Sequence, residues 1–249
     1  LLESLKDVDY PCSAIFITTD KVYKNKEWIH GYRENDELGG RDPYSASKAA
    51  MEIAISSYRD SFCGKSKYQN KNLLIATARA GNVIGGGDWA KDRIVPDIVR
   101  SLSLKKSLLL RNPKAIRPWQ HVLDPLYGYM CLAKKLYECE LKTKDENSFF
   151  ASAFNFGPNI SSAKTVEQLV QKFLIFWNSE YPIDYGVASY NEANTLNLVS
   201  DKAIKYLDWH PKWDFEKTIK NTAQWYLEVN KGKDAFYKCL ENINDYNEN

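Results

Sequence analysis

Tyr44 and Lys48 are four residues apart, a spacing that places two side chains on one face of a helix. A free phenol titrates near ~10, so a fixed positive charge must stabilise its anion before a tyrosine can act as a base at neutral pH. A shift of about three pKa units corresponds to roughly 4 kcal/mol. The pair predicts a base for proton abstraction, although the same spacing also occurs on solvated helix faces.

A second group of reactive side chains follows an apolar, β-branched run at residues 14–18, which predicts a buried parallel strand. Asp20 and Lys21 come directly after this run, at the strand end where open α/β sheets bind their ligands. Residues 73–78 predict a second buried strand that brings Arg79 and Asn82 to the same edge. Without the tyrosine–lysine pair, an ordinary surface Asp-Lys pair would be the preferred interpretation.

The elements that position these residues alternate along the chain. A helical pattern covers residues 45–62, and residues 1–5 read as the last turn of a helix. Further helices are predicted near 96–102, 125–139, 165–177 and 201–226, and strands near 108–111 and 153–158. The polar tail after residue 231 is expected to be partly disordered at its end.

The fold class that this order predicts is α/β: the C-terminal portion of a Rossmann-like doubly wound parallel sheet, with a smaller mixed α/β substrate-binding domain. The expected NAD-binding part covers residues 1–81, with strands and helices returning to it near 115–157. The expected nucleotide-sugar-binding part covers residues 82–114 and 158–249.

Composition narrows the class of protein. The 249 residues carry a net charge of only +2, which favours neither nucleic acid nor a membrane surface as a partner. The five cysteines are odd in number and lack a C-x-x-C pair, so neither a disulfide framework nor a zinc site is expected. Apolar runs are too short for a bilayer, and the first residues do not resemble a signal peptide. We expect a cytoplasmic enzyme that acts on small molecules and uses no metal ion.

Five segments together carry a family resemblance: residues 16–23, 31–36, 42–48, 79–89 and 111–122. They closely resemble the CDP-glucose 4,6-dehydratases, a branch of the extended short-chain dehydrogenase/reductases. The resemblance extends from residue 1 to about 226. Its Gly-Gly-Gly-Asp-Trp and Arg-Pro-Trp-Gln-His segments are more specific than Tyr-x-x-x-Lys.

The resemblance implies a role for each reactive residue. Tyr44 would take the proton of the sugar 4-hydroxyl as hydride passes from C4 to NAD, and Thr19 would hydrogen-bond the same hydroxyl. Lys48 would hold the nicotinamide ribose. Asp20 would protonate the departing 6-hydroxyl, and Lys21 is a candidate base at C5. The implied cofactor-binding residues are Thr18, Tyr44, Lys48 and Arg79.

Other residues are candidates for binding the substrate, CDP-glucose or a related nucleotide sugar. A guanidinium grips phosphate oxygens through two donors, which makes an arginine a natural diphosphate ligand. A turn-forming asparagine, a solvated arginine and a structural histidine remain the alternative interpretations. The candidates are Asn82, Arg93, Arg111, Arg117, Trp119 and His121.

The dinucleotide fingerprint G-x-x-G-x-x-G does not occur in the sequence. We therefore expect the chain by itself to bind NAD weakly or not at all. It is interpreted as a fragment of a normal enzyme, a truncated product, or one half of a split protein with a separate N-terminal chain. A homo-oligomer is expected. A nucleotide-sugar 4-epimerase and an inactive nucleotide-sugar-binding fragment or subunit are the alternative functions.

Overall fold

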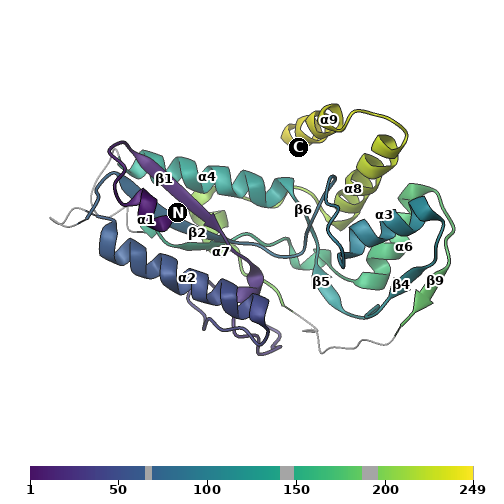
Figure 1. Ribbon diagram of the computed structural model, residues 1–249, viewed down its shortest axis with the longest axis horizontal. Helices are drawn as coiled ribbons and strands as arrows, with labels where there is room; N and C mark the ends of the chain where they lie inside the picture. Colours follow the sequence, from purple (N-terminus) through teal and green to yellow (C-terminus); the bar gives the residue numbers. More distant parts are fainter. Residues whose placement is uncertain (65–68, 141–148, 187–195, 249) are drawn as a thin grey trace. The chain divides into compact units, whose positions relative to one another are not determined.

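The computed structural model describes residues 1–64, 69–140, 149–186 and 196–248. The chain folds into two compact units (Figure 1). The first contains Leu1–Gly81, Pro125–Gly157 and Leu196–His210, and the second contains Asn82–Asp124, Pro158–Thr195 and Pro211–Asn249. The sequence did not indicate the return of Leu196–His210 to the first unit.

A parallel sheet of three strands forms the centre of the first unit, in the order β1 (Cys12–Ile17), β2 (Leu73–Arg79) and β7 (Ala153–Asn155). The middle strand β2 is buried along its whole length, as expected of a parallel strand covered on both faces. The α/β class and both strands predicted before residue 82 are confirmed. The register pairs Ile17 with Ala78 and Arg79 with Asn155, so all three strands end at one edge.

Helices cover this sheet. Figure 1 shows α2 (Pro43–Phe62) and α4 (Leu123–Glu140) on either side of the strands. The short helices α1 (Leu2–Leu5) and α7 (Asp201–Leu207) complete the first unit. Ile55 of α2 packs with Leu73 and Ile75 of β2, which fixes the helix to the sheet. The predicted helices at these positions are confirmed.

The second unit combines strand pairs with a helical core. Its pairs are β3 (Val83–Ile84) with β6 (Gln120–His121), β4 (Leu108–Leu110) with β9 (Ile183–Tyr185), and β5 (Ile116–Pro118) with β8 (Ala163–Thr165). Its helices are α3 (Ile94–Leu104), α6 (Val166–Trp177), α8 (Phe215–Asn230) and α9 (Ala235–Asn247). A 3-10 turn, η2, covers Ile160–Ser162.

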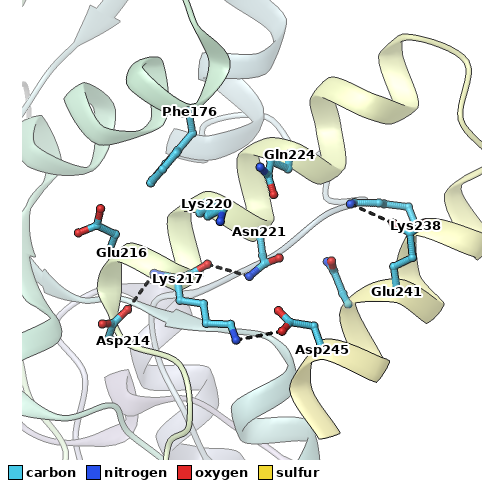
Figure 2. A pocket seen from close by; sticks show the side chains of 11 residues that line it. Phe176, Asp214, Glu216, Lys217, Lys220, Asn221, Gln224, Lys238, Glu241 and Asp245 are labelled. Atoms are coloured by element: carbon cyan, nitrogen blue, oxygen red, sulfur yellow. Dashed lines mark hydrogen bonds and ion pairs between the residues drawn. The ribbon is translucent and has the colours of Figure 1, made fainter. Parts of the chain in front are cut away.

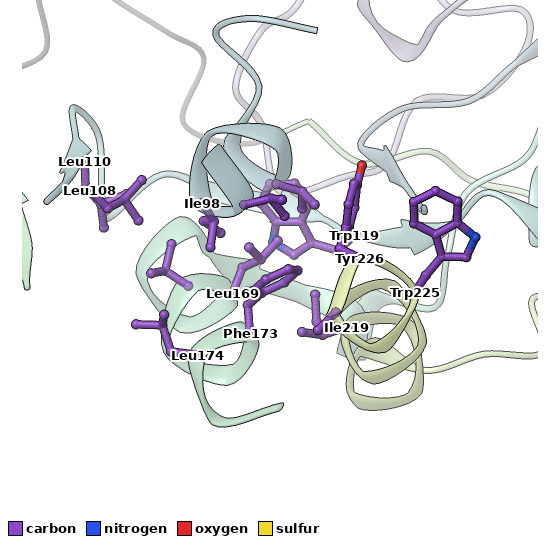
Figure 3. Packing of buried hydrophobic residues seen from close by; sticks show 14 residues of the cluster. Ile98, Leu108, Leu110, Trp119, Leu169, Phe173, Leu174, Ile219, Trp225 and Tyr226 are labelled. Carbon is purple, nitrogen blue, oxygen red and sulfur yellow. The ribbon is translucent and has the colours of Figure 1, made fainter. Parts of the chain in front are cut away.

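The core of the second unit lies between α3, α6 and α8 (Figure 3). Leu169 and Phe173 of α6 meet Ile219 and Tyr226 of α8 there. The helix α6 starts from a capping box, because Thr165 accepts from the backbone of Gln168 and Gln168 bonds back to Thr165. This sequence signal correctly placed the start of the helix.

The prediction of a partly disordered tail is wrong. Residues 235–247 form the helix α9, which packs on α8. Asp234 caps the helix by accepting hydrogen bonds from the backbone amides of Phe236 and Tyr237. Polar composition hid a helix whose cap and periodic apolar positions are both present in the sequence.

Candidate active site

The first group of candidate residues lies in the turn after β1. The backbone amide of Thr18 still bonds to Ala78 at 2.9 Å, and that of Asp20 bonds to the carbonyl of Ala80 at 3.1 Å. Residues Asp20–Val22 then form a 3-10 turn, η1, capped by the side chain of Thr19. The Thr19 hydroxyl donates to Oδ1 of Asp20 at 3.0 Å. The strand end thus holds a hydroxyl and a carboxylate side by side.

Asp20 is 3% exposed, and its carboxylate lies against the backbone of Gly81. A Cβ atom at residue 81 would lie 1.9 Å from Oδ2 of Asp20, so the carboxylate can keep this position only against a glycine. Sequence reasoning did not single out this glycine. The signal for it was a glycine directly after a predicted strand, where close backbone approach is a common reason for the residue.

The predicted catalytic pair, Tyr44 and Lys48, lies in the first two turns of the helix α2. Asp42 caps this helix by accepting from the amide of Ser45 at 3.0 Å, and Pro43 occupies the first turn. Tyr44 is 51% exposed and Lys48 is half-buried. Within the described part of the chain neither side chain makes a hydrogen bond or an ion pair, so both can meet a ligand.

The start of α2 lies beside η1 within the first unit. Gly40 allows the loop before α2 to run against the helix, because a Cβ there would lie 2.3 Å from the amide nitrogen of Ala46. Hydrogen bonds from Ser45 lower the pKa of Asp42, and the charge of Lys21 contributes to the same effect. The structure therefore brings the Thr19-Asp20-Lys21 turn close to the helix start that bears Tyr44 and Lys48.

A buried carboxylate that sequence reasoning missed supports this edge of the sheet. Glu52 of α2 accepts from the hydroxyls of Thr18 at 2.6 Å and Thr77 at 2.8 Å, and it forms a 2.8 Å ion pair with Arg79. Burial alone would raise the pKa of Glu52, but its bonds to Arg79 and the two threonines keep that pKa below its usual value. The available signal was an acidic residue on the inward face of the helix.

Arg79 extends the network to the loop after η1. Its guanidinium donates to the hydroxyl of Tyr23 at 2.8 Å and to the carbonyl of Glu34 at 2.9 Å. Tyr23 in turn donates to Asn155 of β7 at 2.7 Å, and burial raises the pKa of Tyr23 to about 12. The polar groups of the Thr18 and Arg79 side chains are therefore engaged inside the protein, and their cofactor contacts stay predictions.

In the second unit, Asn82 precedes β3 with a φ of 52°, a left-handed conformation that asparagine tolerates. Its carbonyl accepts from the amide of Gln120 at 3.3 Å. The glycine-rich loop that follows is shaped by packing, because a Cβ at Gly86 would lie 2.0 Å from the ring of Trp225. The glycine at this position therefore permits close contact between the loop and α8.

Two of the three candidate arginines are solvent-exposed and ion-paired. Arg111 pairs with Asp92 at 2.6 Å, and Nε of Arg93 lies 3.9 Å from Asp88. Arg117 of β5 is half-buried and donates to the carbonyl of Ile116 at 2.9 Å. Exposed pairs of this kind contribute little to stability, so a phosphate can compete for these guanidinium groups.

The other two candidates in this unit are core residues. Trp119 belongs to the hydrophobic core, and its indole N–H donates to the carbonyl of Lys164 at 3.1 Å. His121 is 1% exposed, packs on the ring of Trp213, and accepts from the amide of Leu123 through Nδ1. Burial lowers the pKa of His121 to about 3. Both side chains are placed for packing.

Among the described residues, no group of acidic, histidine and cysteine side chains is arranged to hold a metal ion. A search of the same residues finds no helix with the length and hydropathy to cross a membrane. The four cysteines whose side chains are described are free thiols, namely Cys12, Cys63, Cys131 and Cys239.

The fold is shared with solved nucleotide-sugar enzymes of the Rossmann-fold dehydrogenase class. A dTDP-glucose 4,6-dehydratase from Streptomyces venezuelae with NAD and TYD bound superposes with a TM-score of 0.73 at 19% identity, over 93% of this chain and 64% of that one. A UDP-glucuronic acid 4-epimerase from Bacillus cereus also gives 0.73, at 16% identity, over 92% of this chain and 65% of that one.

Sequence comparison gives the family. The family model for GDP-mannose 4,6 dehydratase matches residues 1–222, and the chain belongs to this family. A CDP-glucose 4,6-dehydratase from Salmonella typhimurium is 42% identical over 248 residues, covering 99% of this chain and 67% of the relative. A human dTDP-D-glucose 4,6-dehydratase is 23% identical, and the match covers 86% of this chain and 56% of the relative. The chain thus spans two thirds or less of these relatives.

Proposed function

We propose that this chain carries the catalytic side chains of a 4,6-dehydratase that converts CDP-glucose to CDP-4-keto-6-deoxyglucose with NAD as cofactor. The observation that carries the proposal is the placement of the Thr19-Asp20-Lys21 turn beside the helix start that bears Tyr44 and Lys48. The 42% identity to the Salmonella typhimurium enzyme supports CDP-glucose as the substrate.

Tyr44 and Lys48 on α2 fit the nicotinamide end of NAD, because Tyr44 is exposed, Lys48 is half-buried, and their donors are not engaged elsewhere in the described structure. Lys48 would hold the nicotinamide ribose and Tyr44 would face the sugar 4-hydroxyl. When bound, NAD supplies a hydride acceptor at C4 and a hydride donor at C6. The chain's own task is to orient the sugar and move its protons.

Residues of α2 and of η1 carry out different proton-transfer steps. Tyr44 takes the proton of the 4-hydroxyl, while the hydroxyl of Thr19 orients that group. The ketone formed at C4 acidifies the proton at C5, so water can leave across C5 and C6. Asp20 gives its proton to the departing 6-hydroxyl, and Lys21 removes the C5 proton. Protonation of the 6-hydroxyl and removal of the C5 proton need an acid and a base that reach one sugar. Asp20 and Lys21 are neighbours in one turn.

For the substrate we propose Arg93, Arg111 and Arg117 as diphosphate ligands and Asn82 as a further contact. Arg93 and Arg111 are solvent-exposed and Arg117 is half-buried, which supports access of a ligand to these side chains. The substrate contacts expected of Trp119 and His121 stay predictions, and both side chains are buried in this unit. No observation in the structure favours the 4-epimerase interpretation.

The oligomeric state, the location in the cell and the source of the glycine fingerprint are also proposals. A homo-oligomer is proposed by resemblance to the family. A cytoplasmic location is supported by the four described thiols, since disulfides are rare in reducing compartments. A glycine fingerprint carried by another part of the same protein or by a separate chain is also proposed, because binding of a dinucleotide by a Rossmann fold uses one.

A chimera tests the activity directly. This chain replaces the matched region of the Salmonella typhimurium enzyme, whose remaining part completes the protein. Bound NAD, read from the absorbance spectrum, reports that the chimera is folded. We expect a 4-keto-6-deoxy product from CDP-glucose and far less from dTDP-glucose. An NAD-loaded chimera that makes no such product, or that makes the 4-epimer, contradicts the proposal.

A further inference from the structure

A cavity of about 710 Å³ lies among the helices α6, α8 and α9 of the second unit (Figure 2). Its lining is polar apart from Phe176, which extends from α6 toward α8 in Figure 2. Small-molecule sites commonly have volumes of about 300 to 1,000 Å³. The side chains that line it in the described structure include none of those proposed above for catalysis or substrate binding. The cavity is therefore separate from the dehydratase site.

Asn242 of α9 is the residue of this lining that points to a ligand. It is only 6% exposed, and its side chain lines the cavity. Within residues 1–64, 69–140, 149–186 and 196–248, that side chain makes no hydrogen bond. Buried polar side chains nearly always have a hydrogen-bond partner, so this amide has two donors and an acceptor available to a molecule in the cavity.

Two amides of α8 face the same space. Gln224 is half-buried, and its side chain also makes no hydrogen bond to the described part of the chain. Asn221 donates to the carbonyl of Lys217 at 3.1 Å, which leaves its own side-chain oxygen able to accept. The lining therefore offers amide donors and acceptors from two helices.

The charged side chains of the lining are largely neutralised by one another. Four carboxylates and three ammonium groups line the cavity, which leaves one net negative charge. Lys217 bonds to Asp245 at 3.0 Å and Lys238 to Glu241 at 3.2 Å, as Figure 2 shows. Lys220 is solvent-exposed. Charge therefore selects neither an anion such as a phosphate nor a polyamine for this cavity.

We propose that this cavity binds a neutral saccharide. A sugar hydroxyl both donates and accepts a hydrogen bond, as an amide group does, so one ring can satisfy Asn242 and Gln224 together. The ring of Phe176 can pack against the C–H groups on one face of the sugar. The saccharide carries no charge that would compete with the ion pairs of the lining.

NMR titration of the ¹⁵N-labelled protein tests the proposal at the residues that carry it. The side-chain amide signals of Asn242 and Gln224 are assigned by their loss in Asn242→Ala and Gln224→Ala. We expect D-glucose, maltose or cellobiose to shift both signals in a saturable way. The proposal is overturned if none of the three sugars shifts these signals.

Two charged probes test the class of ligand. Glucose 6-phosphate adds negative charge to the same ring, and spermidine is a polyamine of similar size. We expect both to bind more weakly at these signals than the neutral sugars. Tighter binding of either probe would overturn the assignment of a neutral saccharide.

Matched variants separate a binding role from a structural one. Asn242→Ala should weaken sugar binding at least about fivefold, because each hydrogen bond between neutral groups contributes roughly two- to tenfold. Asn244→Ala is the control, since Asn244 is an exposed residue of the same helix outside the lining, and it should leave binding unchanged. Equal binding by the two variants overturns the proposal.

Unfolding in urea gives the complementary readout. Asn242→Ala removes no hydrogen bond to the described chain, so its unfolding midpoint should not lie below that of Asn244→Ala. Gln224→Ala repeats the binding test from α8, and it should weaken sugar binding even if α9 is disturbed. A large fall in the midpoint for Asn242→Ala, together with unchanged sugar binding by Gln224→Ala, would make these amides structural and overturn the proposal.

Discussion

The carboxylate of Asp20 rests on the backbone of Gly81, where a Cβ atom would lie 1.9 Å from Oδ2. Asp20 follows β1 and Gly81 follows β2, so the contact joins the ends of two neighbouring strands. The position of the proposed acid thus depends on the absence of a side chain sixty-one residues away in the sequence.

Gly81→Ala should remove most of the dehydratase activity without unfolding the protein. The clash falls on a side-chain carboxylate, which can rotate away, so the methyl group displaces Asp20 rather than the strand. General acid catalysis contributes about 10²- to 10⁴-fold to rates, and we expect kcat for Gly81→Ala to fall at least tenfold. Steady-state kinetics with CDP-glucose measures the loss.

Asp20→Asn provides the comparison for this variant. If Gly81→Ala acts through Asp20, adding it to Asp20→Asn should cause little further loss of kcat. Full activity in Gly81→Ala would show that the position of Asp20 does not matter for the reaction.

Glu52→Ala should destabilise the protein strongly, because it leaves the guanidinium of Arg79 buried without its carboxylate. Breaking a buried ion pair on one side costs about 3 to 5 kcal/mol. Urea unfolding measures the change. Glu37→Ala is the control, since Glu37 pairs with Lys24 at the surface and should cost less than about 1 kcal/mol. Equal losses in the two variants would contradict the structural role of Glu52.

The pH dependence of Glu52 has a definite sign. Its folded-state pKa lies below the ordinary value of 4.5, so its contribution to stability is present above that value and is lost as the pH falls through the folded-state pKa. Glu52→Gln should therefore lose less unfolding free energy than the wild type when the pH falls below about 4.5. A steeper loss in Glu52→Gln would contradict the direction of the shift.

His121 should make the protein less stable as the pH falls from about 6.5 toward 5, with a slope of up to ~1.4 kcal/mol per pH unit. Burial lowers the pKa of His121 from 6.5 to about 3, so the unfolded chain takes up this proton first and gains stability. Urea unfolding of His121→Gln should show a smaller slope in this range.

Arg111→Ala and Arg117→Ala should raise KM for the nucleotide sugar with little change in kcat. A hydrogen bond to a charged group contributes about 1.5 to 3 kcal/mol, which corresponds to roughly a 10- to 100-fold change in KM for a diphosphate ligand. Arg33→Ala is the control, because Arg33 pairs with Asp36 in the other unit. Unchanged KM values in both variants would remove these arginines from the substrate site.

Local sequence signals predicted the elements that carry the proposed chemistry. The apolar run before Thr18 and the buried run before Arg79 were recognisable as strands, because continuous β-branched and apolar residues favour a covered parallel sheet. The helical pattern over residues 45–62 correctly predicted α2. These features depend on neighbours in the sequence.

Features that depend on distant contacts were not predicted. The Arg-Pro-Trp-Gln-His motif predicts that Trp119 and His121 contact the substrate. In the structure both side chains are buried, and α6, α8 and the segment at Trp213 pack around them. Glu52 gains its importance only when Thr18 and Arg79 meet it in space. The helix α9 was missed because six of its thirteen residues are charged or asparagine, although its apolar residues repeat at helical spacing.

The central claim is that Tyr44 and the turn after β1 perform an oxidation, elimination and reduction on one sugar. Incubation of the NAD-loaded chimera with CDP-glucose carrying deuterium at C4 tests it most directly, with the product analysed by NMR and mass spectrometry. We predict CDP-4-keto-6-deoxyglucose with the deuterium at C6, and no product from Tyr44→Phe. Deuterium retained at C4, a 4-epimer as product, or full turnover by Tyr44→Phe would contradict it.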